Sequence, residues 1–502
     1  MAWLVVAFWL YYAFLRQVAG PLNGDEIYFS HTLWLLNQGK RQYVDFYSNH
    51  LPTYFQLLRP LTAAISSSTT DLSYLWGLRA LSGLLIAAYV ALAWKLWRDA
   101  MPPVSRLGFF GMVAMLLIFV VLGRMVEIRT DTFGLILMNA AWALALSGCS
   151  PRRVAGAAVL AGLAGLFSAR AAGIVGVFGV LLLYLAVRAR DPSRVRALLY
   201  VAGSFLTAGL ILWLIAPEWV ALVLRSCFLE PAKLLGGAVP LRERLLAVER
   251  IPLTLMIVGG LLAGLRLMSG AASERGLIIA VACSAQLLMI LLDPAPFQYV
   301  YGWAAVPAVL GLVSVSRLLS VFFPAFWAAT LVSLAIGYGV VKHASPPTSS
   351  YFRLTLDASL SESELAHVPT PELVMLLMSD KLQMNLTNQL RVRSEVCQRL
   401  GGSTLASFDT HPVCLGDAMF YWTGLRWPAF LVGDVATVDA MSLEAFGRTL
   451  VSARPSLIIW AHRWGNPRAL LPETRQMLAC CYDIYDGFAL STSAPPATVP
   501  VR

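Results

Sequence analysis

The feature that most constrains this chain is a series of long apolar stretches between residues 1 and 343. A helix of about 17–25 apolar residues is long enough to cross the hydrocarbon core of a bilayer. Overall, 58% of the residues are hydrophobic and 13% are charged, whereas ordinary globular domains hold about 25% charged residues. These numbers exclude a soluble enzyme, a disordered chain and a disulfide-dense secreted module. We predict a mainly α-helical, polytopic membrane protein with about eleven transmembrane helices, at residues 2–19, 72–94, 107–123, 132–148, 154–169, 172–187, 197–216, 251–268, 276–292, 302–318 and 321–341.

The loops between these stretches predict the sidedness of the chain. Two alternating sets of loops carry equal numbers of Lys and Arg, but one set packs them into roughly 40 residues and the other spreads them over roughly 100. Basic residues in short loops mark the cytoplasmic side. The N-terminus is therefore predicted to be cytoplasmic, with an uncleaved signal anchor, and the C-terminal region to be extracytoplasmic. The predicted location is the inner (plasma) membrane, and the lipid bilayer is the first expected partner.

Charge and hydropathy divide the chain near residue 343. Residues 1–343 hold 26 Lys and Arg against 14 Asp and Glu, whereas residues 344–502 hold 12 against 14. We therefore predict a transmembrane domain over 1–343, with large outer loops at about 20–71 and 217–250, and a soluble extracytoplasmic domain over 344–502. Within the soluble domain, predicted helices alternate with apolar runs, which indicates a small α/β fold with helices at about 358–368, 371–383 and 386–400 and a buried strand at 457–460.

Four of the seven cysteines fall in this soluble domain: Cys397, Cys414, Cys480 and Cys481. In an extracytoplasmic domain they would form one or two disulfides, with three possible connectivities, or remain buried free thiols. Because neighbouring cysteines seldom bond each other, we do not expect the Cys480–Cys481 pairing. No CxxC pair or His cluster indicates a metal site. Cys149, Cys227 and Cys283 lie in or beside spans and are predicted to be packing residues.

The first outer loop holds the most informative polar residues. Residues 23–39 are predicted to form an amphipathic helix on the membrane face, with Asn23 as the cap and Gly39 at the end. Asp25 and Glu26 have two interpretations. They are either first-turn acids that stabilise the helix dipole, or one of them is a general base at the boundary between water and lipid. Further along the same loop, His50 and Tyr54 stand in an unusually aromatic segment.

Three other groups of polar residues are predicted on the outer side. Arg129 and Asp131 stand at the start of a span, as an interfacial ion pair or as a phosphate-binding site. Arg170 lies in a short hairpin between apolar helices, where an unpaired charge is unfavourable. The segment 293–303 contains Tyr299 and Tyr301, which form either an interfacial aromatic belt or part of a site.

In this order along the chain, the motifs resemble those of the GT-C superfamily of membrane glycosyltransferases. The likeness is greatest to the bacterial branch near the protein O-mannosyltransferases and the lipid A aminoarabinose transferase. Those proteins carry an acidic pair and a following aromatic residue after the first span, here Asp25, Glu26 and Tyr28. They continue with a motif similar to 46–54, in which His50 stands in place of the usual Lys, and with an acidic span start similar to 129–131.

The resemblance implies an inverting glycosyltransferase that moves a sugar from a polyprenyl-phosphate donor to a hydroxyl group of a glycan, lipid or protein acceptor. Asp25, with Glu26 beside it, would be the catalytic acid pair, and Asp25 would act as the general base. Expected substrate-binding residues are Tyr28, His50, Tyr54, Arg129, Asp131, Arg170, Arg225, Arg242, Tyr299 and Tyr301. No cofactor beyond the lipid-linked sugar is required, and neither a divalent metal nor a nucleic-acid partner is expected.

Other functions would also fit a polytopic chain with charges near its spans. The principal alternative is a transporter or a lipid or polysaccharide flippase, although such proteins usually contain two related halves and a site near the bilayer midplane. No related halves are evident here. A different membrane transferase and a non-catalytic membrane subunit are the remaining alternatives.

Overall fold

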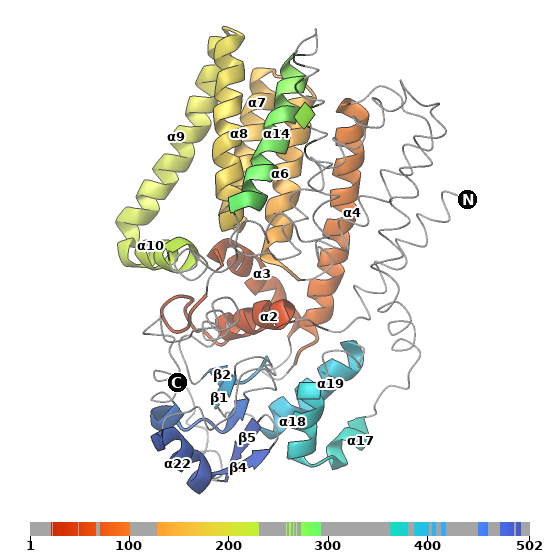
Figure 1. Cartoon of the computed structure of the whole chain (residues 1–502), viewed down its shortest axis with the longest axis vertical. Helices are drawn as coiled ribbons and strands as arrows, with labels where there is room; N and C mark the ends of the chain where they lie inside the picture. Colours follow the sequence, from red (N-terminus) through yellow and green to blue (C-terminus); the bar gives the residue numbers. More distant parts are fainter. Residues whose placement is uncertain are drawn as a thin grey trace, which may run out of the picture. The chain divides into compact units, whose positions relative to one another are not determined.

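The computed structural model is mainly α-helical (Figure 1). It describes residues 22, 24–48, 50–66, 71–100, 128–229, 258, 261, 262, 265, 268, 273–292, 362–379, 386–400, 404–407, 413–417, 450–459, 472–485 and 488–492. The chain forms two compact units, each assembled from separate segments. Unit 1 comprises Met1–Gln17, Ala80–Ala221 and Val239–Thr348, and unit 2 comprises Val18–Arg79, Leu222–Ala238 and Ser349–Arg502. The predicted boundary near residue 343 is based on hydropathy, whereas the two units are defined by packing. That boundary therefore stays a prediction.

Unit 1 is a helical bundle. Its described helices are α4 (Tyr74–Ala100) from Ala80 onward, α6 (Thr130–Leu146), α7 (Pro151–Phe167), α8 (Ala169–Arg188), α9 (Pro192–Ile215), the start of α10 (Pro217–Leu224) and α14 (Ser273–Leu292). Helix α7 packs against α6, α8 and α9, and α14 packs against α8 (Figure 1). Small residues allow this packing, because a Cβ atom at Gly162 of α7 would lie 2.5 Å from the Phe205 ring of α9.

Two described helices are long and apolar enough to cross a membrane: Ala171–Arg188 within α8 and Pro192–Ile215, which is α9. Only 6% of the α9 span is buried, and large apolar side chains such as Leu206, Leu214 and Ile215 are exposed. An apolar helix exposed on all sides is stable in lipid and unfavourable in water. Four more predicted spans coincide with α4, α6, α7 and α14, and the other five lie wholly or largely outside the described residues. The count of eleven therefore stays a prediction.

Unit 2 combines the first outer loop with the C-terminal region. Its helices are α2 (Gly24–Asn37), α3 (Pro52–Ile65), the first turn of α4, the short π-helix η1 (Arg225–Leu229), α17 (Glu362–His367), α18 (Thr370–Ser379), α19 (Leu386–Arg399) and α22 (Pro472–Cys481). A five-stranded sheet has the order β2-β1-β3-β5-β4. Its strands are β1 (Thr404–Ser407), β2 (Gly416–Asp417), β3 (Leu457–Ile459), β4 (Tyr482–Tyr485) and β5 (Phe488–Ser491).

The sheet of unit 2 is mixed. Strand β1 pairs in parallel with β2 and β3, and β5 pairs in antiparallel register with β3 and β4. One core cluster joins β3 and β5 to α18 through Leu457, Phe488 and Val374. A second cluster, which includes Leu373 and Val396, joins helices α17 to α19. The predicted buried strand at 457–460 is therefore confirmed over residues 457–459, and the three predicted helices are found with shifted ends.

Helix α2 ends as the sequence predicts. Gly39 has a φ of +79°, the left-handed conformation that glycine adopts without a steric penalty. The Lys40 N–H donates to the Leu35 carbonyl and the Gly39 N–H donates to the Leu36 carbonyl, which together form a Schellman motif. These bonds occupy carbonyl groups that the end of the helix would otherwise leave without partners.

The surroundings of α2 differ from the prediction. An amphipathic helix on the membrane face would expose one side, but every described side chain from Glu26 to Leu33 is buried. The apolar positions are distributed around the whole helix, and α3 and segments of the C-terminal region in unit 2 cover it. Helix α2 is therefore an internal helix of unit 2, and the prediction of an interfacial helix was wrong.

The cysteine pairing also differs in part. Cys397 bonds Cys414, with their Cα atoms 5.9 Å apart, and Cys480 bonds its neighbour Cys481, contrary to the expectation for adjacent cysteines. The adjacent pair forms the last two residues of α22, directly before β4. Cys149, Cys227 and Cys283 are buried free thiols, so their predicted role in packing is confirmed.

Candidate active site

The first turn of α2 contains the predicted acidic pair. Asp25 is the second residue of the helix, and its side chain lies outside the described part of the structure. The Glu26 side chain is 1% exposed and pairs with Arg79 of α4, which is 3% exposed. Arg79 Nη2 donates a hydrogen bond of 2.7 Å to Glu26 Oε2, and Arg79 Nε lies 2.7 Å from Oε1. Two charges removed from water require such pairing, so Glu26 holds α2 against α4.

Aromatic side chains from α2 and α3 surround the predicted binding residues His50 and Tyr54. The His50 ring lies 4.9 Å from the Phe29 ring and 5.5 Å from the Tyr28 ring, measured between centroids. The Tyr54 ring lies 6.2 Å from that of Phe29. Burial, and after it the negative charge of Glu26, raises the pKa of Tyr54, so its hydroxyl remains protonated. The structure thus brings Glu26, Tyr28, His50 and Tyr54 into one cluster.

A hydrogen-bond network beside this cluster fixes the loop before His50. Tyr28 shares a hydrogen bond of 2.9 Å with Ser48 Oγ, which also accepts one of 2.9 Å from Gln42 Nε2. The His50 carbonyl accepts hydrogen bonds from the Tyr43 hydroxyl at 2.5 Å and from Gln42 Nε2 at 3.2 Å. Sequence reasoning missed Gln42, Tyr43 and Ser48, because nothing in their local pattern separates them from an ordinary polar loop.

Tyr43 also connects this loop to the π-helix η1. Its φ of +69° is a left-handed conformation that a bulky residue rarely adopts. Its hydroxyl lies 3.6 Å from Cys227 Sγ, and the Tyr47 hydroxyl donates to the Ser226 carbonyl at 3.4 Å. The predicted binding residue Arg225 begins η1 and is exposed. Residues 43–47 of the first predicted outer loop and residues 226–227 of the second therefore pack together within unit 2.

Cys227 is predicted to be unreactive toward maleimide in the folded protein. Burial raises the pKa of its thiol to about 12, so at pH 8 roughly one thiol in 10⁴ is ionised, and the thiolate is the reactive form. Labelling of the full-length protein, followed by mass spectrometry, should detect Cys227 only after denaturation. A cysteine placed at the exposed position 64 of α3 is the control and should label without denaturation. Equal labelling rates at both positions in the folded protein would contradict the buried placement.

Arg129 and Asp131 belong to unit 1, at the beginning of α6. Arg129 is the N-cap residue and is 4% exposed, and Asp131 is 6% exposed. Asp131 accepts a hydrogen bond of 2.5 Å from Ser168 Oγ, in the short connection between α7 and α8. Arg170 follows in the first turn of α8, with its side chain outside the described residues. The hydrogen bond from Ser168 thus brings the start of α6, with Arg129 and Asp131, next to the start of α8, where Arg170 is the second residue.

Three predicted site residues lie outside the described residues altogether: Arg242, Tyr299 and Tyr301. In the part of the chain that the structure describes, no group of three or more His, Cys, Asp and Glu side chains is placed to hold a metal ion. The expectation that no metal is required stays a prediction.

Compared with protein-family models, curated proteins and solved structures, the chain matches none significantly. A functional proposal for this chain rests on its own residues and their geometry, together with the resemblance of its short motifs.

Proposed function

We propose that this protein is an inverting membrane glycosyltransferase that uses a polyprenyl-phosphate sugar as donor and a hydroxyl group as acceptor. The observation that carries the proposal is the acidic turn at the start of α2. Glu26 is held by Arg79, and the aromatic cluster with His50 and Tyr54 lies beside the same turn. Position 25 lies about 100° around the helix from position 26, so the two neighbouring acids belong to different sides of α2.

In the proposed reaction, the Asp25 carboxylate accepts the proton of the acceptor hydroxyl. The acceptor oxygen forms a bond to the anomeric carbon from the face opposite the lipid phosphate, and the bond between that carbon and the phosphate oxygen breaks. The electron pair of the broken bond leaves with polyprenyl phosphate, and the anomeric configuration is inverted. General-base assistance of this kind typically contributes about 10²–10⁴ in rate.

The leaving phosphate gains negative charge, so the site requires fixed cations or hydrogen-bond donors. The candidates are the arginines that the sequence predicts on the outer side, Arg129, Arg170, Arg225 and Arg242. Tyr54 provides a hydroxyl that stays protonated, which suits donation to a sugar or phosphate oxygen. The proposed reaction requires no metal ion for this stabilisation.

Two observations support an extracytoplasmic location for the reaction. Two disulfides occur in the C-terminal region, and disulfides persist in oxidising compartments outside the cytosol. The first predicted outer loop and the C-terminal region share unit 2, which supports a position on the same side of the membrane for both. This agrees with the sidedness predicted from the basic loops, and it favours the outer face of the inner membrane.

The proposal is tested with the full-length protein reconstituted in liposomes. The donor is a polyprenyl phosphate that carries a radiolabelled sugar, and the acceptors are lipid, glycan and protein fractions of the cell envelope. We expect protein-dependent transfer of the label, release of polyprenyl phosphate and inversion at the anomeric carbon by NMR. Movement of the intact donor across the bilayer without turnover would instead support the flippase alternative and contradict the enzyme.

A further inference from the structure

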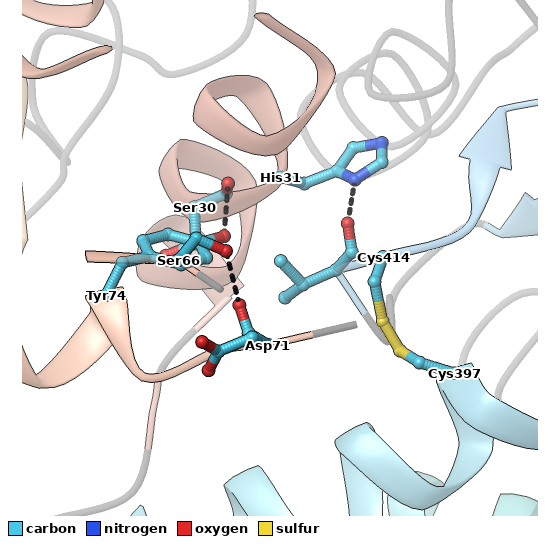
Figure 2. Close-up of a disulfide and its surroundings, with 8 residues drawn as sticks. Ser30, His31, Ser66, Asp71, Tyr74, Cys397 and Cys414 are labelled. Atoms are coloured by element: carbon cyan, nitrogen blue, oxygen red, sulfur yellow. Dashed lines mark hydrogen bonds between the residues drawn. A yellow bond between two sulfur atoms is a disulfide. The ribbon is translucent and has the colours of Figure 1, made fainter. Parts of the chain in front are cut away.

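Two hydrogen bonds connect α2 and the residue Leu22 before it to the C-terminal region, one on each side of the acidic turn. Before the turn, the Leu22 backbone N–H donates to Gln389 Oε1 of α19 at 2.7 Å. After the turn, His31 Nδ1 lies 2.5 Å from the Val413 carbonyl oxygen. Figure 2 marks this hydrogen bond of His31 with a dashed line. A carbonyl oxygen only accepts, so Nδ1 is the protonated nitrogen of this imidazole. Asp25 and Glu26 lie between the two contacts.

The two contact points on the C-terminal region are covalently joined. Gln389 and Cys397 both belong to α19, and Val413 is the residue before Cys414. The Cys397–Cys414 disulfide therefore links the helix that holds Leu22 to the segment that holds His31 (Figure 2). We call these four residues, Gln389, Cys397, Val413 and Cys414, the clamp. The disulfide is inaccessible to solvent, because Cys397 is 0% and Cys414 is 6% exposed.

The backbone of the clamp is held in an unfavourable conformation. Val413 has a φ of +85°, and a β-branched residue in this region is a genuine outlier. Such conformations persist only where the surrounding contacts impose them. The contacts at this position include the disulfide of the following residue, Cys414, and the imidazole of His31 on the Val413 carbonyl. The direction of that carbonyl is therefore fixed for a contact with α2.

The other contacts of α2 in this region also restrict its position. The Tyr74 hydroxyl, from the first turn of α4, donates to the Ser30 carbonyl at 3.0 Å (Figure 2). The His31 ring stacks on Trp34 with 5.6 Å between ring centroids. His31 is 0% exposed, so loss of its hydrogen bond would leave a buried polar group unsatisfied, which is costly.

We propose that the clamp sets the orientation of the acidic turn, with His31 and Gln389 as positioning residues. The catalytic consequence of this inference rests on the proposed function, whereas the restraint that the clamp places on α2 does not. A general base must lie within hydrogen-bond reach of the proton it removes. A displacement of about 1 Å can lower a rate about 10²-fold, so a helix held at both sides of the base favours turnover.

The experiment compares variants of the full-length protein in lipid. His31→Leu removes the donor, and His31→Asn keeps an N–H close to the position of Nδ1. Cys397→Ser with Cys414→Ser opens the clamp, and Cys480→Ser with Cys481→Ser removes the other disulfide as the matched control. Hydrogen exchange over residues 24–37 reports on α2 directly, and kcat and KM are measured for sugar transfer.

We expect His31→Leu and the open clamp to exchange faster in α2 and to lose about 10²-fold in kcat with little change in KM. His31→Asn and the control pair should stay close to the wild type. Unchanged exchange in both perturbed variants would overturn the clamp, whether or not the protein transfers sugar. Wild-type transfer with an unchanged kcat in the open clamp would overturn its role in positioning. Absence of transfer by the wild type would count against the proposed function alone, and the exchange result would still decide the clamp.

Discussion

The variant Asp25→Asn is expected to transfer sugar about 10²–10⁴-fold more slowly than the wild-type protein. Asparagine has nearly the same size and shape as aspartate, but its amide cannot accept the proton of the acceptor hydroxyl. The loss should therefore appear in kcat, while the KM for the lipid-linked donor changes little. The measurement is the initial rate of labelled-sugar transfer in liposomes, with the amount of inserted protein determined for each variant.

Asp45→Asn is the matched control for this prediction. Asp45 lies in the same outer loop, where Arg41 contacts its carboxylate at 3.1 Å on the protein surface. The hydrogen bond from Arg41 lowers the pKa of Asp45, and an exposed pair of this kind contributes little to stability. The control should transfer sugar at the wild-type rate. If Asp25→Asn also retained that rate, Asp25 would not be the base, and the enzyme proposal would lose its central residue.

Local sequence patterns predicted the elements that depend on residues close together in the sequence. Gly39 ends α2 because a left-handed residue closes the helix there, and that requirement is visible within a few residues. The strand at 457–459 follows from a short run of β-branched and apolar residues. The long apolar stretches likewise coincide with α8 and α9, because a bilayer sets the length of a spanning helix.

The sequence could not predict contacts between distant segments. Arg79 is a single charge in an apolar stretch of the sequence, and its partner Glu26 lies 53 positions earlier. The burial of α2 depends partly on Val413, which is 382 positions from His31. Periodicity within a segment carries no information about what covers that segment, so an internal helix was predicted to be interfacial. The same limit applies to Tyr43, whose importance comes from its contacts with His50 and Cys227.

Glu26 and Asp25 are adjacent, and the side chain of Glu26 already has a structural partner. An acid that acts as a base must meet solvent-borne or lipid-borne substrate, whereas Glu26 is 1% exposed and already paired. Its partner Arg79 is equally inaccessible, so the pair has an architectural role at the junction of α2 and α4. Glu26 therefore fixes the helix, and the proposed function assigns the chemistry to Asp25. Substitution of Glu26 or Arg79 is therefore expected to lower the stability of the protein.

Separating the buried pair is expected to destabilise unit 2 strongly. Glu26→Leu leaves the Arg79 guanidinium buried without its counter-charge, and Arg79→Met leaves the Glu26 carboxylate in the same condition. Removal of one partner of a buried ion pair typically lowers the free energy of unfolding by about 3–5 kcal/mol. The measurement is the unfolding of the purified protein in detergent, followed by proteolysis within unit 2 under increasing denaturant.

The double variant, Glu26→Leu with Arg79→Met, distinguishes the ion pair from simple packing. It contains no uncompensated charge, so it should recover much of the stability that either single variant loses. Asp45→Asn, which removes one partner of an exposed pair, should change the unfolding midpoint little. If both single variants were as stable as Asp45→Asn, Glu26 would not be a buried structural residue. It would then be a second candidate for the base, because the chemistry is assigned to Asp25 on the ground that Glu26 is paired with Arg79.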